Sequence, residues 1–198
     1  VIISDDGSKD QTQTRVIDLS KKNTNISLID RSKEKIKGLS ASVVAGITMT
    51  KTSYFVVIDS DLQHPPEKIK DIYFSLVNGS DVAVGTRTKD LSGWHLHRRI
   101  ISKTAIILGR LRLKISGAYC KDVVSGFFGA DTKLIQKILK EKKDVFELEG
   151  YKILFDILKN LPKSTKVSEI NYEFGLRKKG DSKINNRVIR SYIKSLFK

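Results

Sequence analysis

The sequence predicts an α/β domain in which a mostly parallel sheet is flanked by helices. Its 198 residues suit a single domain. Short apolar segments alternate with helical ones through the first half of the chain, which is the pattern of strand–helix–strand units. Residues 54–58 are apolar at every position, as expected of a strand covered on both faces.

In the first half, each expected strand is followed by a turn and a helix. We expect strands at 1–3, 26–29, 54–58 and 81–85, and helices at 10–21, 38–50 and 65–78. Two prolines, Pro65 and Pro66, open the third helix, where proline is favoured in the first turn. The small residues of the second helix allow it to pack closely on a sheet.

The second half is less regular and more basic. We expect a polar loop at 87–94, a long aliphatic and basic helix at 96–115, strands at 127–130 and 166–174, helices at 132–139 and 150–161, and a basic loop at 177–183. From residue 186 onward, apolar residues alternate with arginine and lysine. This tail is expected to form a basic amphipathic helix.

The net charge of +15 favours an anionic partner such as a phosphate-bearing substrate, a membrane surface or nucleic acid. No acidic residue occurs from Leu91 to Lys121. No window reaches the ~20 apolar residues of a membrane span. Cys120 is the single cysteine, which excludes a disulfide within the chain and fits a reducing compartment.

Two carboxylates, Asp59 and Asp61, follow the expected buried strand at 54–58 with Ser60 between them. Ligands of open α/β sheets bind beyond the carboxyl ends of strands. Carboxylate oxygens suit Mg²⁺ or Mn²⁺, and such ions keep positions open for substrate phosphates. A solvated acidic turn is the alternative for so short a motif.

The surrounding residues carry a family resemblance. Residues 54–67, YFVVIDSDLQHPPE, resemble the metal-binding segment of family 2 glycosyltransferases, an apolar strand followed by D-A-D-L-Q-H-P-P-E. Ser60 stands where that pattern usually has alanine. Seven further stretches match the family in the same order: VIISDDGSKD (1–10), GLSAS (38–42), GTR (85–87), RRIIS (98–102), DVVSGFF (122–128), GYKIL (150–154) and FGLRKKGDSK (174–183).

The likeness covers nearly the whole chain and is strongest to the polyprenyl- and dolichyl-phosphate hexosyltransferases, in particular the archaeal type of dolichyl-phosphate mannose synthase. The resemblance implies a GT-A-type nucleotide-sugar-binding domain and an inverting transfer of mannose from GDP-mannose to dolichyl or polyprenyl phosphate. It also implies a membrane-associated protein on the cytoplasmic face. A UDP-glucose or other UDP-sugar transferase remains an alternative within the class.

A non-catalytic basic module that binds nucleotides or nucleic acid is the alternative of another class. No stretch resembles a nucleic-acid-binding motif, so we expect no nucleic acid partner. The two aspartates and the basic residues that match the family motifs favour a working transferase.

On the donor side, the resemblance implies a divalent metal, Mg²⁺ or Mn²⁺, held by Asp59, Asp61 and Gln63. It places the nucleotide-sugar against the residues Ser4, Asp6, Asp59, Ser60, Asp61, Arg87, Arg177 and Lys183. Within that set, Asp6 is expected at the base or ribose. Arg177 and Lys183 are expected on the diphosphate, where a guanidinium fork and an ammonium are complementary.

On the acceptor side, the resemblance implies that Arg87, Arg98 and Ser102 bind the lipid phosphate, so these residues and Asp61 form the expected catalytic set. Arg98 and Ser102 are four residues apart and share a helix face. No general base is required, because a phosphomonoester with a second pKa near ~6 is already largely dianionic at neutral pH.

The family pattern begins with a strand ending in P-T-Y-N-E, and this chain starts after it. We therefore expect the chain to be N-terminally incomplete, with weakened nucleotide binding. Residues 1–184 are expected to form the catalytic domain. Residues 185–198 are expected to form a basic amphipathic helix in the membrane interface.

Overall fold

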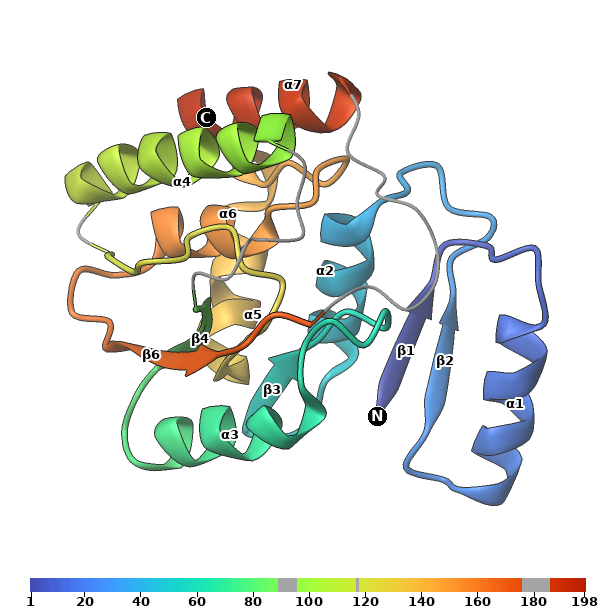
Figure 1. The fold of residues 1–198 in the computed structure, drawn as a ribbon. Coiled ribbons are helices and arrows are strands. Elements are labelled where there is room, and N and C mark those ends of the chain that lie inside the picture. The colour runs from blue at the N-terminus through green and yellow to red at the C-terminus, as the bar shows by residue number, and fades with distance from the viewer. Residues whose placement is uncertain (89–95, 117, 176–185) are drawn as a thin grey trace.

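The computed structural model describes residues 1–88, 96–116, 118–175 and 186–198. Its strands are β1 (Ile2–Asp5), β2 (Ser27–Asp30), β3 (Tyr54–Val57), β4 (Val82–Arg87), β5 (Phe128–Asp131) and β6 (Val167–Tyr172). Its helices are α1 (Thr12–Lys22), α2 (Leu39–Met49), α3 (Ile69–Val77), α4 (Leu96–Ser116), α5 (Thr132–Glu141), α6 (Ile153–Asn160) and α7 (Asn186–Phe197). Two short 3₁₀ turns are η1 (Pro66–Lys68) and η2 (Lys143–Val145). The predicted α/β class is confirmed (Figure 1).

The described strands form two sheets. Strands β1 and β2 pair in parallel, and the other four follow the order β3-β5-β4-β6. Strand β5 runs against β3 and β4, whereas β4 and β6 are parallel. The larger sheet is therefore mixed, because the chain enters β5 from the long segment after α4 in the reverse direction.

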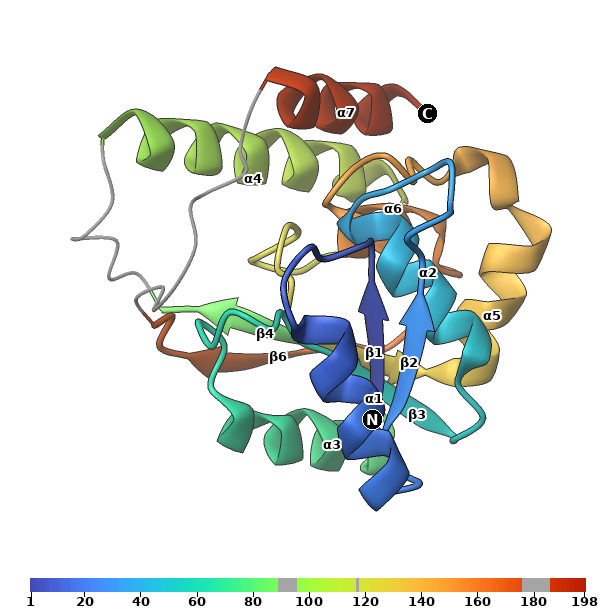
Figure 2. The same ribbon diagram turned by 90° about the vertical axis from the view of Figure 1, so that its right-hand side faces the viewer.

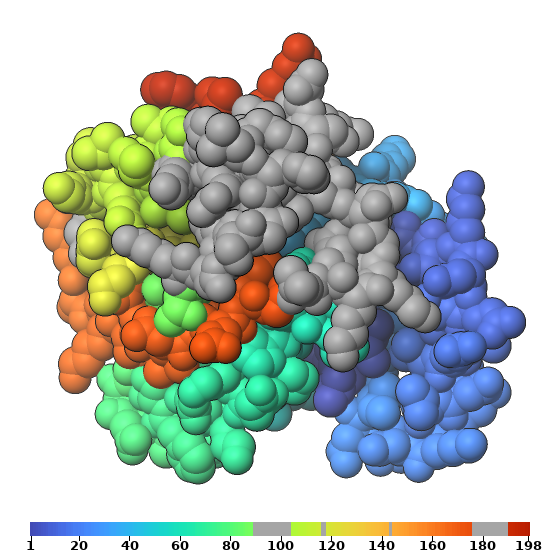
Figure 3. Space-filling view, viewed as in Figure 1, coloured from blue at the N-terminus to red at the C-terminus, as the bar shows by residue number. Residues whose placement is uncertain are grey.

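The two-stranded sheet and α1 stand at one side of the molecule. Figure 1 shows β1, β2 and α1 in blue, apart from the four-stranded sheet. In the space-filling view a notch separates this blue part from α3 at the lower edge (Figure 3). Among the described residues, β1 pairs with β2 alone and β3 with β5 alone.

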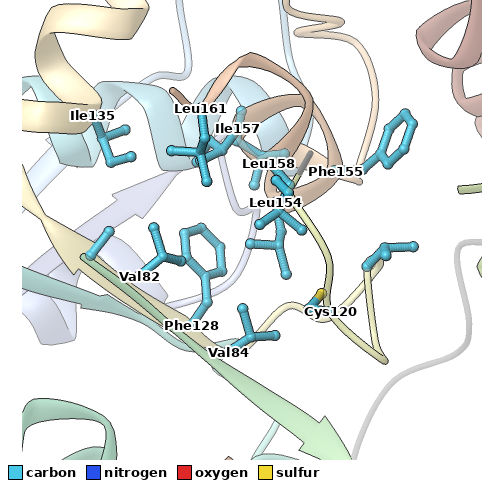
Figure 4. Close-up of a cluster of buried hydrophobic side chains, with 14 of the residues drawn as sticks. Val82, Val84, Cys120, Phe128, Ile135, Leu154, Phe155, Ile157, Leu158 and Leu161 are labelled. Atoms are coloured by element: carbon cyan, nitrogen blue, oxygen red, sulfur yellow. The ribbon is translucent and has the colours of Figure 1, made fainter. Parts of the chain in front are cut away.

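Helix α6 forms the centre of the core above the larger sheet. Its residues from Ile153 to Lys159 are all buried. Figure 4 shows Leu154 and Leu158 facing Val84 and Phe128 of the sheet. The helix lies within the range predicted for it, residues 150–161.

Helix α3 covers the opposite face of the larger sheet. Its Ile72 and Leu76 pack in a second cluster with Ala83 and Phe127. Strand β4 thus has helices on both sides, and its first five residues are buried. The most buried strand of this sheet is therefore an inner one, since β4 lies between β5 and β6. The continuous apolar run predicted at 54–58 forms β3 instead, which pairs with β5 alone among the described strands; Phe55 is buried and its other residues are half-buried, which is less covered than predicted.

The predicted tail helix is present as α7 and lies beside α4 at the top of the molecule in two perpendicular views (Figures 1 and 2). Its Tyr192 and Leu196 are buried, and the Tyr192 hydroxyl donates to the Ala105 carbonyl at 2.7 Å. Beneath it, a buried ion pair joins Lys159 and Asp156 at 3.2 Å, and Lys159 also donates to the Ser195 carbonyl. The inner face of α7 is therefore fixed to the domain.

The turn after β1 is built around the buried carboxylate of Asp5. The carboxylate accepts hydrogen bonds from the backbone amides of Gly7 and Ser8 at 2.9 and 2.8 Å, and from the Gln13 side chain at 2.7 Å. Burial acts to raise the pKa of Asp5, but the hydrogen bonds from Ser8, Gln13 and Gly7 outweigh it and lower the pKa from 3.8 to about 2.

These bonds stabilise the charged form of Asp5, so its contribution is present above pH 3.8 and is lost as the pH falls toward 2. The shift corresponds to about 2 kcal/mol. We expect Asp5→Asn to lower the free energy of unfolding by about that amount at pH 7, and by much less at pH 2. Urea denaturation at a series of pH values measures the difference. A difference that stays constant over this range would contradict the assignment.

Candidate functional site

The Asp59–Gln63 segment leaves the carboxyl end of β3 through a strained turn. Leu62 has φ of 60°, the one positive φ at a non-glycine residue in the described part of the chain. Left-handed backbone is costly for a residue with a Cβ, and such strain gathers at functional sites. Here it brings the amide of Gln63 to 3.1 Å from Oδ1 of Asp61.

Asp59 is held from two sides. Nε2 of His64 lies 3.2 Å from its Oδ2. On the other side the backbone of Gly126 comes so close that a Cβ there would lie 2.8 Å from the same oxygen. The side chain of Asp59 nevertheless remains 31% exposed, so the carboxylate is oriented and still accessible.

Gln63 connects this turn to the end of the described segment 118–175. Its side-chain amide donates to the carbonyl of Gly175 at 3.0 Å, and the amide of Gly175 donates back to the Gln63 carbonyl at 2.8 Å. Gly175 begins the approach to the predicted basic loop. The loop residues Arg177 and Lys183 lie outside the described residues.

The donor set at this turn fits a hard divalent cation. Asp59 and Asp61 are both partly exposed, and Gln63 adjoins them with a buried side chain. Among the described residues there is no group of three or more histidine, cysteine, aspartate or glutamate side chains arranged for a metal. Two carboxylates and an amide suit Mg²⁺ or Mn²⁺, which take their other ligands from water or substrate phosphates.

Asp6 links the end of β1 to the segment between β2 and α2. Its Oδ1 accepts from Nε of Arg31 at 2.8 Å, and its Oδ2 accepts from the amide of Gly38 at 2.6 Å. Arg31 is buried and also donates to the carbonyl of Ile36 at 2.6 Å. Ser4 lies in β1 with a buried hydroxyl that has no hydrogen-bond partner among the described residues. The nucleotide contacts of Asp6 and Ser4 stay predictions.

Arg87 ends β4 in a bidentate pair with Asp122. The Nε–Oδ2 and Nη2–Oδ1 distances are 2.6 and 2.9 Å, and the guanidinium carbon lies 5.5 Å from the ring centre of Phe174. Burial acts to lower the pKa of Arg87, but the hydrogen bonds and charge of Asp122 outweigh it and raise the pKa above its usual value. The sequence analysis assigned Arg87 to the site. Its partner Asp122 begins a stretch that resembles the family, residues 122–128, but was not predicted to be a site residue.

Of the remaining predicted residues, the structure describes Ser60 in full and only the backbones of Arg98 and Ser102. Arg98 and Ser102 lie on α4, but their side chains are outside the described residues. Ser60 is exposed in the turn between the two aspartates. His64, to which the sequence analysis gave no chemical role, contacts Asp59 directly. The one sequence feature that could have indicated this contact is its position three residues after Asp61.

Comparison with known proteins agrees with this geometry. The sequence profile described as glycosyl transferase family 2 matches residues 1–139. The chain is 37% identical to the dolichol-phosphate mannosyltransferase of Pyrococcus furiosus, over 100% of this chain and 54% of that protein. It is 34% identical to the protein of the same name from Mycosarcoma maydis, over 99% of this chain and 65% of that one.

A solved structure shares the fold. It is glucosyl-3-phosphoglycerate synthase from Mycobacterium tuberculosis in complex with Mn²⁺, UDP-glucose and phosphoglyceric acid, with a TM-score of 0.67 and 17% identity. The likeness covers 99% of this chain and 66% of that one. This chain therefore has the GT-A fold of that enzyme.

The chain spans 54% and 65% of the lengths of the two mannosyltransferases it matches. The family profile covers residues 1–139, and the sequence likeness to both relatives extends over nearly the whole chain. The chain belongs to glycosyl transferase family 2.

Proposed function

We propose that this chain is the catalytic part of an inverting glycosyltransferase that moves mannose from GDP-mannose to dolichyl or polyprenyl phosphate. The family and the names of the two mannosyltransferase relatives support the reaction class. The observation that carries the proposal is the strained turn after β3, where Asp59 and Asp61 are partly exposed at the carboxyl end of a strand.

On the donor side, Asp59, Asp61 and Gln63 hold Mg²⁺ or Mn²⁺. An ion held there would supply positive charge to the leaving diphosphate. Asp59 offers Oδ1, because its Oδ2 is engaged by His64. Ser60, exposed between the aspartates, faces the nucleotide-sugar.

At the other end of the donor, Asp6 and Ser4 position the base and ribose beside β1. Asp6 does so with a carboxylate that Arg31 and Gly38 already hold in one orientation. Arg177 and Lys183 offset the charge of the diphosphate.

On the acceptor side, Arg87, Arg98 and Ser102 bind the phosphate of the lipid. The attacking oxygen belongs to a phosphate that is largely dianionic at neutral pH, so no residue has to remove a proton from it. Orientation and charge stabilisation then account for the rate. Asp122 fixes the guanidinium of Arg87 for this purpose, and the bidentate pair limits its movement.

A membrane surface supplies the acceptor. Four large apolar residues on α4 are exposed, with Ile107, Leu108, Leu111 and Ile115 between 43% and 78% accessible. Their spacing places them along one side of the helix. On the neighbouring α7, Phe197 is 87% exposed. Exposed apolar surface on a chain of net charge +15 suits an anionic lipid interface on the cytoplasmic side.

Helices long and apolar enough to cross a membrane are not found in the described part of the chain. The exposed apolar residues of α4 and α7 are assigned to contact with the surface of the bilayer. The predicted role of residues 185–198 is part of this proposal, with the outer side of α7 facing lipid.

A UDP-sugar donor is the second candidate. The solved structure with the same fold was crystallised with UDP-glucose. The third candidate is a non-catalytic binding module, and the experiment below distinguishes it from both transferases.

We expect Asp61→Ala to reduce sugar transfer by about 100-fold or more, because one of two carboxylates on the metal is lost. Labelled GDP-mannose and UDP-glucose are offered in parallel with dolichyl phosphate and Mn²⁺. Asp18→Ala is the control, since this acid is 59% exposed and pairs with Lys21 on α1.

Mannolipid formed by the parent protein and by Asp18→Ala, but not by Asp61→Ala, is the predicted result. Glucolipid instead would keep the mechanism and replace the donor. Equal transfer by Asp61→Ala and the parent would contradict the metal site. No lipid product from either donor would favour the non-catalytic reading.

We also expect the double change Ile107→Ser and Leu111→Ser to weaken binding to anionic phospholipid vesicles by about tenfold, because two exposed apolar side chains are lost from the lipid contact. The matched control is Phe74→Ser, which removes a side chain of 56% exposure from α3 on the opposite side of the molecule (Figures 1 and 2). Cosedimentation measures the binding. An equal loss for Phe74→Ser would contradict the assignment of the α4 face.

A further inference from the structure

His64 is buried in an aromatic cage between the metal-binding turn and β6. It is 2% exposed. Its ring centre lies 5.4 Å from that of Phe127, 5.5 Å from that of Tyr172 and 5.2 Å from that of Phe174. These contacts fix the plane of the imidazole without using either ring nitrogen.

Both nitrogens of His64 have partners. Nδ1 lies 2.8 Å from the hydroxyl of Tyr172, and Nε2 lies 3.2 Å from Oδ2 of Asp59. Tyr172 is 108 residues away in the sequence and is 2% exposed in β6. The imidazole thus connects the rigid sheet to the first aspartate of the turn.

The chemistry of the partners assigns the protons in the neutral ring. A carboxylate only accepts hydrogen bonds, so Nε2 of His64 donates to Asp59. A neutral imidazole has one N–H, so Nδ1 accepts from the Tyr172 hydroxyl. Burial raises the pKa of Tyr172, which keeps that hydroxyl protonated and able to donate.

The remaining side of Asp59 is closed by Gly126, where a Cβ would come within 2.8 Å of Oδ2. Gly126 and His64 together constrain the position of Oδ2, and we assign Oδ1 to the ion. Residues outside a metal's own ligands commonly orient those ligands in this way.

We propose that His64 is a positioning residue for the metal site: it holds Asp59 in the metal-binding orientation, and Tyr172 holds His64 in the tautomer that does so. The inference rests on the proposed function, since it requires that Asp59 and Asp61 bind the ion. It adds a residue outside the metal ligands, and a partner on β6 that anchors the turn to the sheet.

The test compares two amide replacements. His64→Gln carries its amide nitrogen near the place of Nε2 and keeps a donor for Asp59, whereas His64→Asn carries it near Nδ1 and does not. We expect His64→Asn to weaken Mn²⁺ binding by tenfold to a hundredfold, about the range measured for changes to residues that orient metal ligands. We expect His64→Gln to stay within about threefold of the parent. Electron paramagnetic resonance titration of Mn²⁺ in the presence of GDP, repeated with UDP, measures the affinity, and thermal unfolding confirms that both variants fold.

Tyr172→Phe tests the second half of the proposal. It removes the donor to Nδ1, so ¹⁵N NMR of His64 changes from a single tautomer with an unprotonated Nδ1 to a mixture of two. Tyr192→Phe is the matched control, because it removes another buried tyrosine hydroxyl, one that donates to Ala105 at 2.7 Å far from the turn. We expect it to leave both the His64 signals and Mn²⁺ affinity unchanged.

Equal Mn²⁺ affinities for His64→Asn, His64→Gln and the parent would overturn the inference, as would a parent spectrum with the proton on Nδ1. Asp61→Ala separates this failure from that of the proposed function. If Asp61→Ala abolishes binding while both His64 variants bind normally, the metal site stands and the positioning role is wrong. If Asp61→Ala binds Mn²⁺ as the parent does, the metal site itself is wrong.

Discussion

The rest of the site depends on one electrostatic constraint: two carboxylates one residue apart have to stay charged and point in a common direction. Asp59 and Asp61 repel each other unless donors or a cation neutralise them. The chain meets this constraint with backbone strain at Leu62, which turns the amide of Gln63 to within 3.1 Å of Asp61. His64 supplies the donor to Asp59 at 3.2 Å. These two donors offset part of the repulsion between the carboxylates, so the site can be preorganised in the absence of a bound ion.

Behind the turn, the sheet ends in an aromatic layer that joins separate parts of the sequence. Tyr172 and Phe174 contact His64 on one side, and Phe174 lies under the guanidinium of Arg87 on the other. Asp122, from the segment before β5, completes a bidentate pair with Arg87. The donor and acceptor ends proposed here therefore share one rigid support, and a change in this layer is expected to affect both.

Much of the fold and the place of the proposed metal-binding turn follow from local sequence. The apolar run before Asp59 and the prolines after it predicted a strand, a turn and a helix, and these are present. The reversed direction of β5 did not follow, because strand direction depends on how the chain returns to the sheet. Nor did the pairs Asp6–Arg31, Arg87–Asp122 and His64–Tyr172, since each joins residues 25 to 108 positions apart. A motif shows which side chains are available, whereas the tertiary fold decides what they contact.

The central claim is that the turn after β3 holds the divalent cation. The most direct measurement is anomalous diffraction at the manganese edge from crystals grown with Mn²⁺ and GDP. The account predicts an anomalous peak within coordination distance of Asp61 and of Oδ1 of Asp59, with Oδ2 of Asp59 still bound to His64. A peak elsewhere on the molecule, with both aspartates free of metal, would contradict it.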